Sequence, residues 1–164
     1  MGTKITNMKR LKCSKFLFVS DFMLCTIIIL FFLGVYLFAI LNDWNNGIHL
    51  IILLPFLMLM SILGYHLFFI INYYLYDKNT LIEIDTNGNV MYSNMNKKKH
   101  FHLNDIDLCT AFNARFAGFT EILLKDGYRL YVTDYIPLEV IYKMDTKIER
   151  EVAYTWLKIL RREE

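Results

Sequence analysis

The sequence predicts a membrane α-hairpin followed by a small α+β domain. Apolar residues make up 55% of the 164 positions and are concentrated between about residues 16 and 76. From residue 80 onward apolar and polar side chains alternate, as in strands, and from residue 146 apolar residues recur every three or four positions, as in a helix. We therefore expect an antiparallel meander of about six strands, shaped as a half-open barrel, with a C-terminal amphipathic helix. So uneven a composition excludes an ordinary single-core soluble enzyme.

Charge divides the chain into three parts. Residues 1–15 hold five positive charges and no acid, and residues 16–76 hold only Asp21 and Asp43. Residues 77–164 carry 13 basic and 14 acidic side chains and are nearly neutral. These parts are expected to be a basic cytoplasmic arm, a two-helix transmembrane hairpin and a cytoplasmic β-domain with its C-terminal helix. The net charge of +2 is too small to indicate nucleic-acid binding.

Two uncharged stretches are long enough to cross a bilayer. Residues 22–41 number 20 and residues 50–71 number 22, and a helix of that length spans the ~30 Å hydrocarbon core. A polar turn containing Trp44, a residue typical of membrane interfaces, lies between them. Basic residues precede the first span and are absent from the turn. The positive-inside rule therefore predicts a multi-pass protein of the cell (inner) membrane with both termini in the cytoplasm.

Two residues of the second span are candidates for a function inside the membrane. Pro55 leaves a backbone carbonyl one turn earlier without its donor, which predicts a kink or a loosened outer end of the helix. His66 is a titratable group within a span, and such groups often line a pore or relay protons. It also lies near enough to the cytoplasmic end to reach the interface. The spans therefore either only anchor the protein or contribute a pore.

Six short strands are expected in the β-domain. Asn87-Gly88 and Asp126-Gly127 are residue pairs preferred in tight hairpin turns, and each separates two alternating segments. Lys97–Lys99 are interpreted as a further, basic turn. The expected strands are 81–85, 90–95, 100–103, 106–112, 119–125 and 128–133.

The last segment is predicted to be a helix. Thr146 to Glu149 has the spacing of a capping box, in which a hydroxyl and a carboxylate satisfy backbone amides of the first turn. The residues expected to form one apolar face are Ile148, Val152, Trp156, Ile159 and Leu160. Such a helix would cover one face of the sheet or one end of the barrel.

This order of elements resembles a pleckstrin-homology-like domain. The likeness is carried by the two hairpins, by Leu103-Asn104-Asp105-Ile106, by Tyr128-Arg129-Leu130-Tyr131-Val132 and by Trp156. With its two N-terminal spans, the chain is similar to the bacterial membrane-anchored versions, sometimes called YcxB-like, over roughly residues 76–162. The resemblance implies a binding platform rather than a catalyst, and it brings no common catalytic residues.

The residues offer little for catalysis or for metal binding. Cys13, Cys25 and Cys109 have no paired spacing. Asp105 and Asp107 lie at the start of a strand, in a domain too small for the cleft that a pair of catalytic carboxylates needs. The sequence contains no nucleophile elbow, P-loop or dinucleotide fingerprint. We therefore expect a non-enzyme without a cofactor or a metal.

One group of cationic residues is the candidate ligand-binding site. It comprises Lys97, Lys98, Lys99, His100 and His102, together with Arg129 elsewhere on the sheet. Lysines at a hairpin bind phosphate groups as point charges, and the two histidines, two apart on a strand, share one face. A solvated loop beside the core explains the same residues.

Three functions are compatible with these observations. The first is a membrane-tethered module that binds a protein or a phosphate-bearing ligand at the bilayer surface. The second is an antiphage-defence effector, in which the β-domain senses a cyclic nucleotide and a homo-oligomer of the hairpin disrupts the membrane. The third is a toxin immunity protein. The lack of catalytic motifs favours the binding module.

Overall fold

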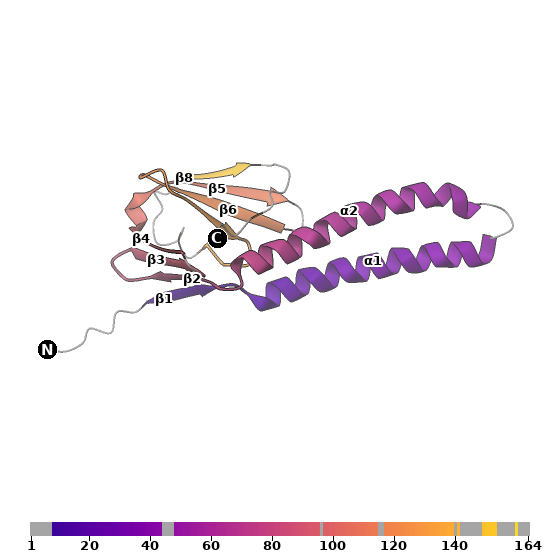
Figure 1. The fold of residues 1–164 in the computed structure, drawn as a ribbon, viewed down its shortest axis with the longest axis horizontal. Helices are drawn as coiled ribbons and strands as arrows, with labels where there is room; N and C mark the ends of the chain where they lie inside the picture. The colour runs from indigo at the N-terminus through magenta and orange to yellow at the C-terminus, as the bar shows by residue number, and fades with distance from the viewer. Residues whose placement is uncertain are drawn as a thin grey trace.

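The computed structural model describes residues 8–43, 48–95, 97–114, 117–139, 141, 149–153 and 160. Two long helices extend from one end of a small β-domain (Figure 1). The described residues form eight strands in two four-stranded sheets. Each of the six expected strands is present, and the other two lie at the two ends of the chain, where no strand was expected.

Helices α1 (Lys15–Asp43) and α2 (Ile48–Asp77) lie side by side and run antiparallel (Figure 1). With 29 and 30 residues, they are roughly 43 and 45 Å long at 1.5 Å per residue. The Cys25 thiol donates to the Leu63 carbonyl at 3.8 Å, and the rings of Tyr36 and Phe56 stack with centroids 4.2 Å apart. The α-helix continues through Pro55.

Both helices are long and apolar enough to cross a membrane. Only 6% of the most apolar stretch of each helix is buried within the protein. Large apolar side chains, such as Phe31 and Phe38 of α1 and Ile51 of α2, are instead exposed. Helices that are apolar on all sides and not covered by protein are expected in lipid rather than in water.

The first sheet has the strand order β1-β2-β3-β4 and is antiparallel throughout. Its strands are β1 (Lys9–Lys12), β2 (Thr80–Ile84), β3 (Asn89–Asn94) and β4 (Lys97–His102). Strand β1 comes from the basic arm, where the sequence indicated no strand, and it pairs with β2. Both helices are therefore inserted between two neighbouring strands of one sheet.

The interpretation of Lys97–Lys99 as a turn is wrong. These residues are the first half of β4, with Lys98 opposite Ser93 and Lys99 opposite Tyr92. The chain turns earlier, around Met95, which has a φ of +48°. Pairing with β3 outweighs the low strand propensity of lysine, because propensity is a weak preference beside a complete backbone ladder.

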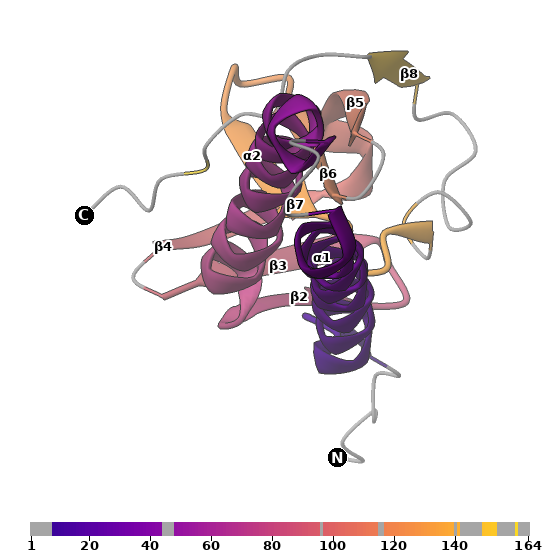
Figure 2. The ribbon, with the colours of Figure 1, turned by 90° about the vertical axis from the view of Figure 1, so that its right-hand side faces the viewer.

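The second sheet has the order β7-β6-β5-β8. Its strands are β5 (Ile106–Ala114), β6 (Ala117–Leu124), β7 (Arg129–Thr133) and β8 (Glu149–Ala153). Strands β5, β6 and β7 are antiparallel, as the two hairpin signals predict, and β8 runs parallel to β5. Figure 2, seen along the helices, shows the two sheets as separate layers, with β4 as the strand of the first sheet nearest the second.

The expected helix is not formed at residues 149–153, which are strand β8. Its backbone pairs with the edge of β5, which would otherwise leave unpaired amides and carbonyls. This pairing depends on residues about 40 positions away, so helical spacing alone does not predict it. Positions 146–148, 154–159 and 161–162 of the expected helix lie outside the described residues.

The main core lies between the two sheets. Its buried side chains are Leu11, Ile82, Ile84, Val90, Tyr92, Leu103, Ile106, Cys109, Ile122, Leu124, Leu130, Val132, Ile136, Leu138 and Ile141. Those on strands come from alternating positions, as expected for sheets that each bury one face, and the connecting segments add Leu103, Ile136, Leu138 and Ile141. The contribution of Leu11 makes β1 part of this core.

A second apolar cluster joins the helices to the second sheet. Phe69, Ile70 and Tyr73 of α2 pack with Phe119 of β6 and with Tyr135. The rings of Tyr73 and Phe119 meet edge to face at 5.9 Å. The end of α2 is thus packed against the domain rather than joined to it by a linker.

Polar contacts fix the same junction. The Asp77 carboxylate is fully buried and accepts a hydrogen bond from the Thr133 backbone N–H at 2.6 Å and another from the Thr80 hydroxyl at 2.8 Å. The side chain of Asn72 exchanges two hydrogen bonds with the backbone of Leu160. These bonds hold α2 at a set angle to the sheets.

A substitution at Gly118 should destabilise the domain. A Cβ at this position would touch the Asp134 carboxylate and lie 2.9 Å from the backbone oxygen of Phe112, which cannot move without distorting β5. We expect Gly118→Ala to cost about 1–3 kcal/mol of unfolding free energy, measured by chemical denaturation in detergent. Gly34→Ala is the control, because its Cβ would have no atom within 4 Å. Equal stability of the two variants would contradict this packing.

Candidate functional site

The predicted site residues of β4 do not face the same way. Side chains alternate across a strand, and Phe101 packs against the core between the sheets. Lys97 and Lys99 therefore lie on the inner face with Phe101, whereas Lys98 and His100 lie on the outer face. The three lysines do not converge on one point.

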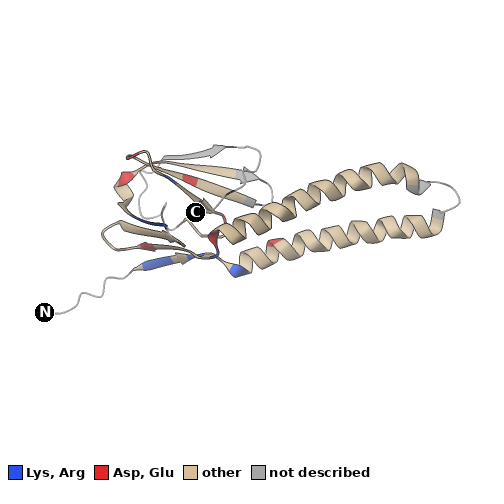
Figure 3. Ribbon diagram, in the orientation of Figure 1, with Lys and Arg blue, Asp and Glu red and all other residues tan. Residues whose placement is uncertain are grey.

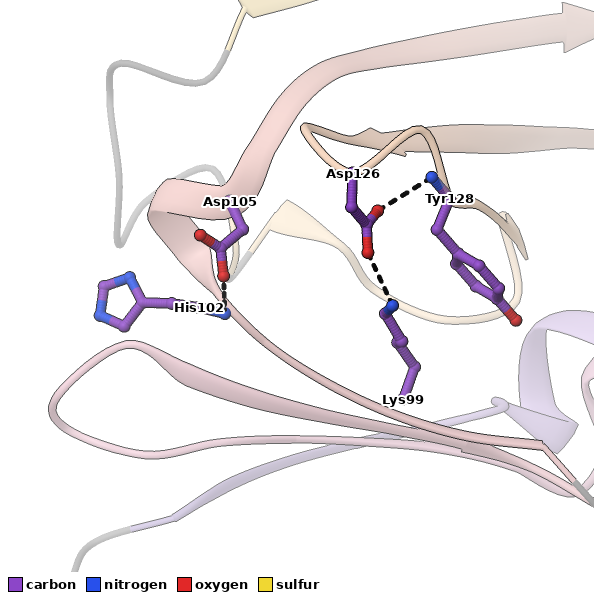
Figure 4. A network of polar contacts seen from close by, with 5 residues as sticks. All are labelled: Lys99, His102, Asp105, Asp126 and Tyr128. Carbon is purple, nitrogen blue, oxygen red and sulfur yellow. Dashed lines mark hydrogen bonds and ion pairs between the residues drawn. The ribbon is translucent and has the colours of Figure 1, made fainter.

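Lys99 connects the two sheets. Its Nζ lies 2.7 Å from Oδ2 of Asp126, in the turn between β6 and β7, and 4.7 Å from the centroid of the Tyr128 ring (Figure 4). The Lys99 ammonium, with the backbone N–H of Tyr128, holds the pKa of Asp126 below its usual value. Lys99 is thus engaged within the domain rather than presented to a ligand.

His102 has a structural role in the neighbouring turn. Its Nδ1 accepts a hydrogen bond from the Asn104 backbone N–H at 3.1 Å. Its Nε2 lies 2.8 Å from the Asn87 carbonyl oxygen, to which it must donate. These contacts fix the neutral tautomer. The ring lies against Gly88, whose φ of +86° suits the tight turn, and both ring nitrogens are occupied.

Arg129 lies apart from the lysines on β7. Its guanidinium is 2.9 Å from the Glu121 carboxylate of the adjacent strand, which also accepts from the Tyr131 hydroxyl at 3.3 Å. Of the six predicted ligand-binding residues, Lys98 and His100 therefore remain together as exposed basic residues on the outer face of the first sheet.

The sheet brings further basic residues to that face, which the sequence analysis missed. In the strand register, Lys12, Leu81, Ser93 and Lys98 form one row across the sheet. Arg10, Glu83, Met91 and His100 form the next row. Lys12 and Arg10 belong to β1, which meets β2 only in the folded chain, and residues 9–12 (Lys-Arg-Leu-Lys) carry no alternating pattern that would have indicated the strand.

A shallow groove of about 460 Å³ runs over the second of these rows. It is lined by Met8, Glu83, Asp85, Asn89, Val90, Met91, His100 and Phe101. Four of the lining residues are apolar and four are polar or charged, and His100 and Phe101 are contributed by β4. We refer to this feature as the outer groove.

The acidic residues of the outer groove already have partners. Glu83 is nearly buried, and its carboxylate lies 2.7 Å from Nε of Arg10. Asp85 accepts hydrogen bonds from the Asn89 side chain and from the backbone of Asn87 and Asn89, which holds the pKa of Asp85 below its usual value. Glu83 thus neutralises Arg10, whereas the partners of Asp85 are neutral amides and leave it ionised; the basic residues of this face without an acidic partner in the groove are Lys12, Lys98 and His100.

Basic residues also surround the end of the domain where the helices leave. Figure 3 shows basic residues along β1 and at the first turn of α1. Lys12 and Lys15 flank the entry to α1, and Lys78 follows α2 directly; all three side chains are exposed. The end of the domain next to the helices is therefore basic.

The two candidates within α2 do not form a common site. Pro55 and His66 are 11 positions apart on one helix, roughly 16 Å along its axis. The His66 ring lies edge-on to its neighbour Tyr65 at 6.1 Å. The positions of Pro55 and His66 therefore do not by themselves define a pore.

The three cysteines are not prepared to act as nucleophiles. Burial raises the pKa of the Cys13 thiol to about 11, so it is protonated at neutral pH. Cys25 and Cys109 are buried free thiols. Within the described part of the chain, no three His, Cys, Asp or Glu side chains are grouped to hold a metal ion.

The comparisons with known proteins agree with the strand arrangement. A family model described as a PH domain matches residues 4–136, which include β1, both helices and the strands up to β7. No curated protein and no solved structure gives a significant match. The matched region begins before β1, so the family similarity covers β1 and the strands on the far side of the two helices. This agrees with the structure, in which β1 is part of the first sheet. The chain belongs to the PH domain family.

Proposed function

We propose that this chain is a membrane-tethered, non-enzymatic module that binds an anionic partner on the outer face of its first sheet. The observation that carries the proposal is the arrangement of four basic side chains there, of which Arg10 is paired with Glu83. Lys12 and Lys98 occupy one cross-strand row, and Arg10 and His100 occupy the next, beside the outer groove. Histidine adds positive charge only when protonated, so Lys12 and Lys98 contribute most at neutral pH.

The junction supports a fixed orientation of this face. Strand β1 precedes α1 by two residues, α2 is followed almost directly by β2, and the bonds of Asp77 fasten α2 to β7. The first sheet lies beside the ends of both helices (Figure 1), and in the view along the helices its strands run across the picture (Figure 2). With the helices across a bilayer, the first sheet is held near the membrane surface, within reach of molecules at that surface.

The basic residues before α1 and after α2 support a cytoplasmic location for the domain under the positive-inside rule. The partner is then an acidic protein segment or a phosphate-bearing ligand. The geometry gives less support to a cyclic-nucleotide effector, because the lysines of β4 point to opposite faces and Lys99 is paired with Asp126. The function we propose requires neither a cofactor nor a homo-oligomer.

The proposal is tested with the full chain in nanodiscs of zwitterionic lipid. The probes are poly-L-glutamate and inositol hexakisphosphate, and binding is measured by calorimetry at low salt. We expect at least one probe to bind and Lys98→Glu combined with Lys12→Glu to weaken it about tenfold or more, since reversed charges repel the probe. Lys125→Glu is the matched control, an exposed lysine in the turn between β6 and β7. Binding of neither probe, or equal weakening by the control, would overturn the proposal.

A further inference from the structure

Among the described strands, β4 is an edge strand, and the backbone groups on its unpaired side can be identified. In an antiparallel pair, hydrogen-bonded residue pairs alternate with non-hydrogen-bonded ones. The Leu103 N–H donates to the Gly88 carbonyl at 2.9 Å, one step beyond the register of β3 and β4. Every second residue before Leu103 therefore also forms backbone hydrogen bonds with β3, which gives Phe101 and Lys99. The backbone groups of Lys98, His100 and His102 therefore point away from the sheet.

The contact of His102 agrees with this assignment. Its N–H donates to the Asp105 carboxylate at 2.8 Å rather than to β3 (Figure 4). Within the described part of the chain, β4 pairs only with β3. Lys98 and His100 each offer one N–H and one carbonyl at this edge, four groups in all, spaced to accept a further strand.

The side chains along the edge determine which kind of strand fits. Lys98 and His100 are exposed on the outer face, so a neighbouring strand would place its own side chains directly opposite them. Acidic residues at those positions complement Lys98 and protonated His100. The outer groove adjoins this edge at His100 and Phe101.

A second copy of this chain is a poor occupant of the same edge. Two β4 strands paired with each other would bring Lys97, Lys98 and Lys99 of both copies close together, and like charges opposite one another destabilise a sheet. The edge of β5 is already covered by β8. Charge complementarity therefore favours an acidic strand from another protein.

We infer that β4 binds an extended acidic segment of a protein partner by strand addition, with the backbone groups of Lys98 and His100 forming the new ladder. This inference rests on the proposed function and specifies its partner. It predicts that binding depends on the outward N–H of Lys98 as well as on its charge. Simple charge attraction to a solvated face depends on the charge alone.

The test uses the full chain in zwitterionic nanodiscs and the peptide acetyl-Val-Glu-Val-Glu-Val-amide. Lys98→Ala removes only the charge and should weaken binding about threefold. Lys98→Pro also removes the outward N–H and should weaken it about tenfold further. Proline is tolerated on the solvent side of an edge strand, and an unchanged thermal unfolding temperature verifies the fold. The matched peptide with lysine in place of glutamate should not bind.

Hydrogen exchange keeps the inference testable if Lys98→Pro fails to fold. The amides of Lys98 and His100 in the unaltered chain should exchange more slowly with the acidic peptide present, and those of β1 should not change. Equal affinity of the alanine and proline variants, or no protection of these amides in the bound state, would overturn strand addition. If the peptide fails while poly-L-glutamate or inositol hexakisphosphate binds, the proposed function stands and only this inference falls.

Discussion

Replacing Lys9–Lys12 by Gly-Ser-Gly-Ser in the full chain should unfold the β-domain while both helices persist. The replacement removes Leu11 from the core between the sheets, which alone costs about 2–5 kcal/mol. It also leaves the nearly buried Glu83 carboxylate without Arg10 and uncovers the edge of β2. A domain of this size has a free energy of unfolding of only about 5–15 kcal/mol. The combined loss is therefore close to the entire stability of the domain. Near-ultraviolet circular dichroism in detergent measures the outcome.

A matched variant separates loss of the strand from loss of positive charge. Lys9→Ala with Lys12→Ala removes two exposed charges and keeps Arg10 and Leu11 in place. We expect it to unfold within about 0.5 kcal/mol of the unaltered chain. A fragment beginning at residue 77 lacks β1 altogether and should resemble the Gly-Ser variant. A native-like spectrum from that fragment would show that β1 is dispensable.

Removing the Asp77 carboxylate should have the second largest effect. Asp77→Ala leaves the buried Thr133 N–H without its 2.6 Å acceptor and the Thr80 hydroxyl without its partner. A buried donor that loses its acceptor costs about 1–3 kcal/mol, and more when the acceptor was charged. We therefore expect a loss of about 3 kcal/mol or more, measured by denaturant unfolding in detergent, with the end of α2 losing its set position against β7.

An exposed carboxylate provides the control for Asp77. Asp107 lies on β5 with an exposed side chain, and Asp107→Ala should change stability by less than about 0.5 kcal/mol. Asp77→Asn retains one acceptor oxygen and should fall between the two. If Asp77→Ala proves no more harmful than Asp107→Ala, the junction does not depend on this carboxylate.

Local signals in the sequence predicted much of the fold. The two hairpins follow from Asn87-Gly88 and Asp126-Gly127, because a tight turn needs a positive φ that glycine supplies, and both glycines have one. The two long helices follow from uninterrupted apolar stretches. In each case the cause lies within a few residues of the effect.

The two unpredicted strands depend on distant partners instead. Strand β1 has four residues, and its pairing partner lies about 70 positions away, beyond both helices. Its lysines and arginine are equally typical of a flank that sets membrane topology. Residues 149–153 have helical spacing in isolation, and only the free edge of β5 makes a strand of them.

The candidate site was predicted in part for the same reason. Lys98 and His100 were identified from their charge, but their association with Arg10 and Lys12 requires the register of four strands. Lys99, His102 and Arg129 were included among the predicted ligand-binding residues because the sequence does not show that other residues of the chain bind them. The structure gives those partners as Asp126, the turn at Asn87, and Glu121.

Zero-length carbodiimide cross-linking of poly-L-glutamate to the full chain in zwitterionic nanodiscs tests the central claim most directly. The reagent joins a carboxylate only to an amine in contact with it, and mass spectrometry identifies the lysine. Binding on the outer face of the first sheet predicts cross-links at Lys98 and Lys12, and few at Lys125 of the turn between β6 and β7. Cross-links mainly at Lys125, or spread evenly over all exposed lysines, would contradict a binding site on this face.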